Sequence, residues 1–161
     1  MNAIHPADDE LLITRTFDAP AAVLFAAWTR PEHFVRWFGP MDFECPEVSI
    51  DLRIGGAYRA TIRSPTRGEN RFGGVYREIV PNRRLVFTFV WDNEGPSHGV
   101  ETVVTVTLEE RDGKTVQTLH QRGFADVERR DSHVGGWTSC LEKLATYAPR
   151  NAIQIARENA T

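Results

Sequence analysis

The sequence VETVVTVTLEERDGKTVQTLHQR, residues 100–122, decides the fold of this chain. Two runs rich in β-branched residues, Val100 to Leu108 and Thr115 to Arg122, flank the dipeptide Asp112-Gly113. An Asp-Gly pair between two such runs is a strong signal of an antiparallel hairpin with a two-residue turn. The sequence therefore predicts a hairpin in which Arg111 lies opposite Lys114.

The register of this hairpin predicts which side chains face the protein interior. Directly opposed residues of an antiparallel pair share one face of the sheet, and a slip of one residue would reverse that face. The residues Val104, Val106 and Leu108 form the more apolar side of their strand. We therefore expect their partners to point inward; these are, in order, Gln121, Leu119 and Gln117.

The rest of the chain supplies more strands and few helices. About six strand-like runs follow Pro40 with no helical pattern among them, and one more precedes Asp18. Two short helices are expected between Asp18 and Trp37, and a long one from about Asp126 that Pro149 ends. A sheet of this length needs a cover, which only the chain ends can supply. The sequence predicts an α+β fold in which a curved antiparallel sheet of about seven strands grips a long C-terminal helix.

The chain is expected to form one domain with a tail at each end. Its 161 residues suit a single hydrophobic core. Residues 1–10 carry three adjacent acidic residues and no apolar run, so we expect a disordered N-terminal tail and no signal peptide. Residues 11–148 are the expected domain, and residues 149–161 are the expected C-terminal tail.

Composition narrows the classes of function. The net charge of −3 does not favour a nucleic-acid partner, and no apolar run approaches a membrane span. The two cysteines, Cys45 and Cys140, do not make a disulfide framework, so a reduced cytoplasmic protein is expected. The five histidines show no metal-ligand spacing, so neither a metal nor a cofactor is predicted. The sequence is compatible with a homodimer and does not determine the oligomeric state.

The inward-facing residues predict an internal pocket. An even-length loop at Pro81-Asn82 would place Tyr76 and Glu78 on the face of Phe87. The interior is then apolar with a few polar groups, which is the general form of a small-molecule site of roughly 300–1,000 Å³. A packed core with buried water is the alternative, but one long helix covers a whole sheet poorly. The residues expected to bind a ligand are Trp37, Tyr58, Tyr76, Phe87, Phe89, Trp91, Val106, Gln117, Leu119, His133, Trp137 and Cys140.

Two adjacent glycines interrupt the C-terminal helical pattern at Gly135-Gly136, directly before Trp137. Two glycines inside a helix cost about 1–2 kcal/mol relative to alanines. Close approach of the helix to the sheet is the interpretation that we favour, and flexing of the helix around a ligand is the alternative. In either case Trp137 is expected to anchor the helix on the sheet.

Several short motifs, in order, resemble one protein family. They are Phe17-Asp18-Ala19-Pro20, Ala27-Trp28-Thr29-Arg30-Pro31-Glu32, Arg36-Trp37-Phe38-Gly39-Pro40, Asp51-Leu52-Arg53-Ile54-Gly55-Gly56-Ala57-Tyr58, Gly74-Val75-Tyr76-Arg77-Glu78, Arg84-Leu85-Val86-Phe87-Thr88, Gln121-Arg122-Gly123-Phe124, and His133 with Gly136-Trp137. Over about Leu12 to Tyr147 the chain resembles the bacterial proteins named after an activator of the heat-shock chaperone ATPase. These belong to the START-related, birch-pollen-allergen-like superfamily, SRPBCC.

The resemblance implies a helix-grip fold, with a seven-stranded antiparallel sheet around the C-terminal helix and two short helices that close one end. It also implies a hydrophobic cavity for a lipid-like or polycyclic ligand. Gln117 departs from the apolar residue expected at its strand position, which predicts a more polar pocket.

Three functions follow as hypotheses. The first is a cytoplasmic binding or carrier protein for a small hydrophobic ligand. The second is an enzyme of the cyclase, dehydratase or hydrolase type, in which Glu78 acts as the acid or base because an aromatic pocket would raise its pKa, with Tyr58 or Tyr76 as its proton partner. A purely structural Glu78, paired with Tyr58 or Gln117, is the interpretation that we favour for this residue. The third is a chaperone cofactor that acts through its surface, which rests on analogy of fold.

Overall fold

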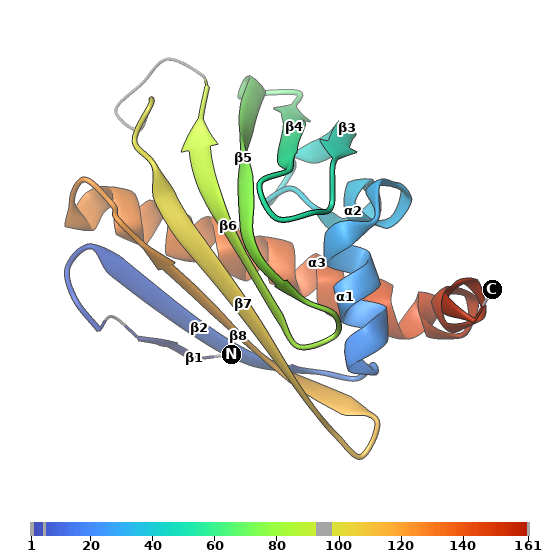
Figure 1. Ribbon diagram of the computed structural model, residues 1–161. Coiled ribbons are helices and arrows are strands. Elements are labelled where there is room, and N and C mark those ends of the chain that lie inside the picture. The colour runs from blue at the N-terminus through green and yellow to red at the C-terminus, as the bar shows by residue number, and fades with distance from the viewer. Residues whose placement is uncertain (1, 5, 93–97, 161) are drawn as a thin grey trace.

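The computed structural model describes residues 2–4, 6–92 and 98–160, and its chain forms one antiparallel sheet with three helices (Figure 1). The sheet order is β1-β2-β8-β7-β6-β5-β4-β3, and the long helix α3 lies across one face. The elements are β1 (Asn2–Ile4), β2 (Glu10–Phe17), α1 (Ala21–Thr29), α2 (Pro31–Trp37), β3 (Glu44–Ile50), β4 (Ala57–Ser64), β5 (Gly68–Val80), β6 (Arg84–Trp91), β7 (Thr102–Arg111), β8 (Lys114–Arg122) and α3 (Val127–Asn159).

The predicted α+β architecture is confirmed. The sheet curves around α3, and the two short helices α1 and α2 follow β2 and close the end of the sheet near β3 (Figure 1). The core lies between the sheet and these helices, and it contains side chains from every one of them. This arrangement is the helix-grip fold that the resemblance implied.

The β7–β8 hairpin has the predicted register. Arg111 pairs with Lys114, and Leu108 pairs with Gln117. Asp112 and Gly113 both adopt positive φ angles, of 54° and 78°, as a two-residue turn of this kind requires. Gln117 is consequently buried, with 1% of its surface exposed.

The prediction that Glu78 faces inward is wrong, because the β5–β6 connection is of odd length. Val80 pairs with Arg84, which leaves a loop of residues 81–83 and places Glu78 opposite Val86. A register shift between Tyr76 and Glu78 then returns Tyr76 to a position opposite Phe87, which is the effect of a β-bulge. The Glu78 side chain is 47% exposed and forms an ion pair with Arg84 at 2.9 Å.

The predicted C-terminal tail, residues 149–161, is helical over most of its length. Helix α3 continues through Pro149 to Asn159, and its last turns change direction (Figure 1), as expected where a proline removes a helical hydrogen bond. Tertiary contacts hold this end: Ile155 is fully buried, and Glu158 accepts a hydrogen bond from His33 at 2.7 Å. Packing therefore overrides the proline.

The predicted disordered tail, residues 1–10, is also structured in part. Asn2–Ile4 forms β1, which pairs with β2 in the register Asn2 opposite Thr14. Arg130 of α3 donates hydrogen bonds to the carbonyl oxygens of Ala7 and Asp8, both at 3.3 Å. Pairing of a short edge strand and hydrogen bonds from a helix side chain therefore order part of the N-terminal segment, which its composition predicted to be a disordered tail.

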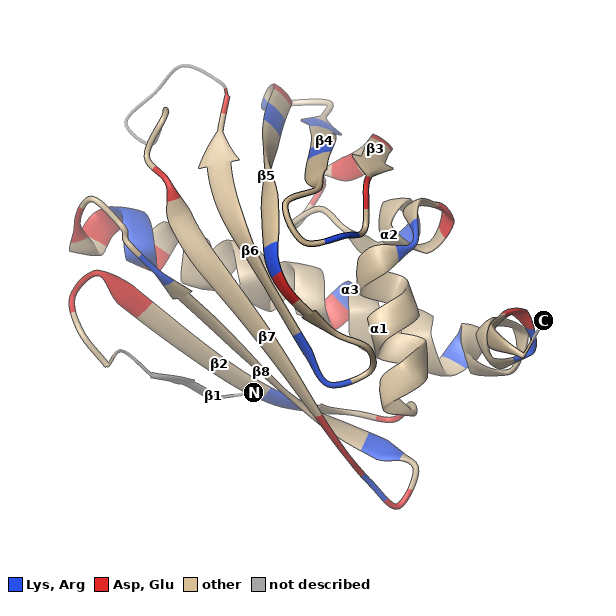
Figure 2. Ribbon diagram, viewed as in Figure 1, with Lys and Arg blue, Asp and Glu red and all other residues tan. Residues whose placement is uncertain are grey.

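Most charged side chains lie at the surface of the fold, although Arg130 is only 7% exposed. Figure 2 shows most of β6 and β7 without charge, while acidic and basic residues lie at hairpin tips, along β5 and on the helices. Among the described residues, no helix combines the length and the apolar character needed to cross a membrane.

The interpretation that both helix glycines allow close packing is wrong for Gly135. A Cβ atom added there would meet nothing within 4 Å, and one added at Gly136 would lie 3.9 Å from Pro40 Cβ, which is ordinary contact. We expect Gly135→Ala to raise the free energy of unfolding by about 0.5–1 kcal/mol, because alanine restricts the unfolded chain and fits the helix. Urea denaturation monitored by circular dichroism measures this difference.

Gly74→Ala is the matched control for that measurement. An added Cβ at Gly74 would lie 2.0 Å from the Thr88 carbonyl oxygen of the neighbouring strand. This variant is expected to lose about 1–3 kcal/mol or more, because the strands must separate. A Gly135→Ala variant that is less stable than the parent would contradict the assignment of open space at that position.

Candidate ligand-binding site

An aromatic cavity lies between β3–β6, the two short helices and α3. Its volume is about 20 Å³, which is enough for about one water molecule. All of the residues around it are apolar or aromatic: Trp28, Phe34, Phe38, Val48, Ile50, Tyr58, Phe72, Tyr76, Leu85, Phe87, Phe89 and Trp137. We call this space the main cavity. It is much smaller than the predicted pocket, so the interior is nearly filled.

The main cavity approaches solvent at the edge of the sheet. Ten of its lining residues are buried, and only Val48 and Ile50 are half-buried. Both belong to β3, which is the last strand of the sheet. On the other side of this edge, Phe34 and Phe38 from α2 and its C-terminal end stack at a centroid distance of 4.6 Å. β3, which lies beside α2, is therefore the most exposed part of the cavity wall.

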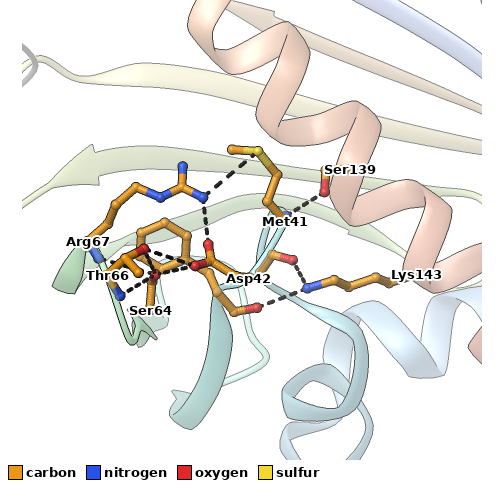
Figure 3. Close-up of polar contacts among 9 residues, drawn as sticks. Met41, Asp42, Ser64, Thr66, Arg67, Ser139 and Lys143 are labelled. Carbon is orange, nitrogen blue, oxygen red and sulfur yellow. Dashed lines mark hydrogen bonds and ion pairs between the residues drawn. The ribbon is translucent and has the colours of Figure 1, made fainter.

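The loop that joins α2 to β3 is fastened to two other elements (Figure 3). The Lys143 ammonium group on α3 donates hydrogen bonds to the carbonyl oxygens of Gly39 at 2.5 Å and Phe43 at 2.9 Å. The Asp42 carboxylate accepts hydrogen bonds from the hydroxyl groups of Ser64 at 2.8 Å and Thr66 at 3.1 Å.

The environment of Asp42 keeps its carboxylate ionised. Its hydrogen bond from Ser64, together with those from Arg67 and Thr66, lowers the pKa of Asp42. Arg67 also forms an ion pair with this carboxylate at 2.5 Å. The ion pair between Asp42 and Arg67 is exposed and contributes little, but the same loop also buries Phe43 in the core, with 7% of the residue exposed. Release of the loop therefore requires that Phe43 leave the core.

Two buried glutamines hold the indoles that line the main cavity. The Trp137 indole donates to Gln121 Oε1 at 2.7 Å, and Gln121 Nε2 donates in turn to the Thr102 hydroxyl at 2.8 Å. The Trp28 indole donates to Gln117 Oε1 at 2.8 Å. Gln117 Nε2 has no hydrogen-bond partner among the described residues. The inward glutamines therefore orient the cavity wall.

A second, smaller cavity of about 10 Å³ lies near the start of α3 and contains Trp91 and His133 in its lining. His133 Nδ1 donates to the Arg129 carbonyl oxygen at 2.7 Å, and His133 Nε2 accepts from the Trp91 indole at 3.0 Å. These partners fix a neutral imidazole. Burial lowers the pKa of His133, while the hydrogen bond to Arg129 raises it to a smaller degree.

The predicted ligand-binding residues divide into three groups. Tyr58, Tyr76, Phe87, Phe89 and Trp137 line the main cavity. Gln117, Trp37, Val106, Leu119 and Cys140 are buried in the core but do not line it, and Trp91 and His133 line the smaller cavity.

Sequence reasoning missed the contribution of the short helices to the cavity wall. Trp28, Phe34 and Phe38 come from α1, α2 and the end of α2. Their aromatic character and helical spacing were visible in the sequence, but nothing local showed which way the two helices pack.

Acid–base and nucleophilic chemistry find little support in this site. Glu78 lies on the surface in its ion pair with Arg84, outside the main cavity. Burial raises the pKa of the Cys45 thiol to about 11 and that of the Cys140 thiol to about 12, so both are protonated at neutral pH and weakly nucleophilic. Within the described residues, no group of three or more His, Cys, Asp or Glu side chains is arranged to hold a metal ion.

The lowered pKa of His133 predicts a pH dependence of stability. Below pH 6.5 the imidazole of His133 binds a proton in the unfolded chain but stays neutral in the folded protein, because its pKa is lower there. The free energy of unfolding therefore falls as pH decreases from 6.5 towards the pKa of the folded state. Urea denaturation of the wild type between pH 5.5 and 7.5 should show this slope, and His133→Asn should show a smaller one. Equal slopes in the two proteins would contradict a neutral, buried His133.

Comparison with solved structures shows several close matches to this fold. A protein of Chromobacterium violaceum is 27% identical with a TM-score of 0.77, and the match covers 86% of this chain and 96% of that one. The AHSA1 protein of Silicibacter pomeroyi is 26% identical with a TM-score of 0.75, and the match covers 85% and 95%. A protein of Arthrobacter aurescens, 20% identical with a TM-score of 0.80 over 92% and 91%, shares the fold.

No curated protein matches the chain. The sequence model of one family, described as activator of Hsp90 ATPase homolog 1-like protein, matches residues 18–148. This range contains both short helices, β3 to β8 and α3 as far as Ala148. The chain therefore belongs to the family of proteins like activator of Hsp90 ATPase homolog 1.

Proposed function

We propose that this protein binds a small, flat, apolar molecule in the main cavity. The observation that carries the proposal is the unfilled space itself, which is lined only by apolar and aromatic residues and approaches solvent between β3 and α2. An apolar wall with very few polar groups is the usual form of a site for an apolar small molecule. Such a molecule gains free energy by leaving water, and planar rings stack well on aromatic side chains.

Binding requires the cavity to expand. A dry apolar cavity of about 150 Å³ accommodates benzene, whereas the main cavity measures about 20 Å³. The wall formed by Phe34 and Phe38 supplies the difference, because α2 has only seven residues. This movement must break the two hydrogen bonds from Lys143 and displace the buried Phe43. The closed form is then the ligand-free conformation. A molecule with higher affinity for the open form shifts the population towards that form.

The other two functions have less support. The enzyme hypothesis needed an acid in the pocket, and Glu78 lies outside it. The chaperone-cofactor hypothesis keeps the description of the family as its support, but it has no counterpart to the physical site that the cavity gives to ligand binding. Binding of a small apolar molecule is therefore the function that the geometry supports best.

Substitution of a β3 residue in the cavity wall tests the proposal. We expect Ile50→Trp to weaken binding of 4-fluoro-α-methylstyrene at least about tenfold, because the indole would fill the half-buried position on the wall of the site. Titration followed by ¹⁹F NMR of the probe measures the affinity. Circular dichroism and thermal denaturation establish that each variant is folded.

Ser49→Trp is the matched control, because Ser49 neighbours Ile50 on β3 but is exposed on the opposite face. This variant should bind the probe with the affinity of the wild type. Absence of saturable binding to the wild type, or equal affinities for the wild type and Ile50→Trp, would count against a site in the main cavity.

A further inference from the structure

We infer that the ligand of the main cavity carries one hydrogen-bond acceptor, such as a ketone or ether oxygen, and that the hydroxyl group of Tyr76 donates to it. This inference rests on the proposed function and defines the chemical class of the ligand more narrowly. Its basis is a difference between the two tyrosines in the cavity wall, Tyr58 and Tyr76, whose ring centroids lie 5.6 Å apart.

The hydroxyl group of Tyr58 is already used by the protein. It donates to the Thr88 carbonyl oxygen at 2.7 Å, and only 5% of the residue is exposed. This hydrogen bond satisfies the Tyr58 hydroxyl and ties the ring of β4 to the backbone of β6. Tyr58 therefore contributes its aromatic surface to the cavity and has no donor left for a ligand.

The hydroxyl group of Tyr76 is not used in this way. Only 4% of the residue is exposed, and the described part of the chain provides no hydrogen-bond partner for its hydroxyl. This oxygen is nevertheless not one of the fully enclosed side-chain atoms without a partner, which are Gln117 Nε2 and Arg129 Nε among the described residues, so it retains contact with accessible space. A phenolic hydroxyl that has no protein partner and retains accessible space is free to donate a hydrogen bond to a molecule that enters that space. A ligand oxygen in the main cavity would supply the missing partner.

The backbone fixes the position of Tyr76 well. Its carbonyl oxygen accepts from Gly55 N at 2.8 Å, and its amide donates to the Gly56 carbonyl oxygen at 3.0 Å. The bulge between Tyr76 and Glu78 aims its side chain inward, as described above. The Gly55-Gly56 turn and the bulge thus hold Tyr76 in a defined position in the cavity wall.

The protonation state of Tyr76 determines what it can recognise. Burial raises the pKa of Tyr76 well above its ordinary value, so the phenol remains neutral and is able to donate at any physiological pH. No acidic residue lines the main cavity, and a cation would be desolvated there without compensation. The chemistry therefore fits an uncharged, flat molecule that is apolar except for one acceptor oxygen.

A pair of isosteric probes tests this inference. 4′-Fluoroacetophenone and 4-fluoro-α-methylstyrene have nearly the same shape and differ in a C=O in place of a C=CH₂ group. We expect Tyr76→Phe to weaken binding of the ketone relative to the alkene by about 3- to 10-fold, as measured by ¹⁹F NMR titration. Tyr58→Phe should leave the ratio of the two affinities unchanged, although it should lower thermal stability through loss of the bond to Thr88.

The outcomes separate this inference from the proposed function. If both probes bind and Tyr76→Phe leaves their affinity ratio unchanged, the role of Tyr76 is wrong while the apolar site stands. If neither probe binds to the wild type, the site itself is wrong. Tyr76→Phe should fold without loss of stability, because it removes a hydroxyl that has no partner among the described residues; a marked loss of stability would also overturn the inference.

Discussion

An aromatic layer between the sheet and α3 is the constraint on which the structure depends. Trp137 of α3 contacts Trp28 at a ring-centroid distance of 5.8 Å and Phe38 at 5.8 Å, and Phe72 stacks on Phe89 at 4.6 Å within the sheet. Large rigid rings bury much apolar surface but prefer tilted or edge contacts. On a curved sheet they leave a gap, and the main cavity is that gap. Its position at β3 and α2 follows because the chain has only short helices with which to close this end.

The sequence predicted the half of the sheet whose register depends on a local turn. Asp112-Gly113 specifies one turn geometry, so the partners of Gln117 and Leu119 could be assigned from the sequence. The β5–β6 connection could not be assigned in this way, because Pro81-Asn82 is compatible with more than one loop length. The three-residue loop and the bulge reverse the face of Glu78 but keep that of Tyr76, and the only proposed catalytic residue was lost from the site as a result.

Long-range contacts account for the other differences between prediction and structure. Pro149 is a helix-ending signal in isolation, but burial of Ile155 and the contact between Glu158 and His33 keep α3 helical beyond it. The contribution of α2 to the cavity likewise depends on packing that no local pattern specifies. The size of the cavity was the largest error, since ring packing between α2 and α3 fills most of the predicted space. Under the proposed function, ligand binding would be coupled to opening of the cavity, and the contacts of Asp42 and Lys143 would contribute to the free energy of opening.

The most direct measurement of the central claim is a ¹H–¹⁵N NMR titration of the tryptophan indoles with 4′-fluoroacetophenone. Trp28 and Trp137 line the main cavity, whereas Trp91 lies against His133 in the smaller one. The account predicts saturable shifts of the Trp28 and Trp137 indole signals, with a much smaller change at Trp91. Saturable binding that leaves the Trp28 and Trp137 signals in place would show that the molecule binds elsewhere and would contradict the account.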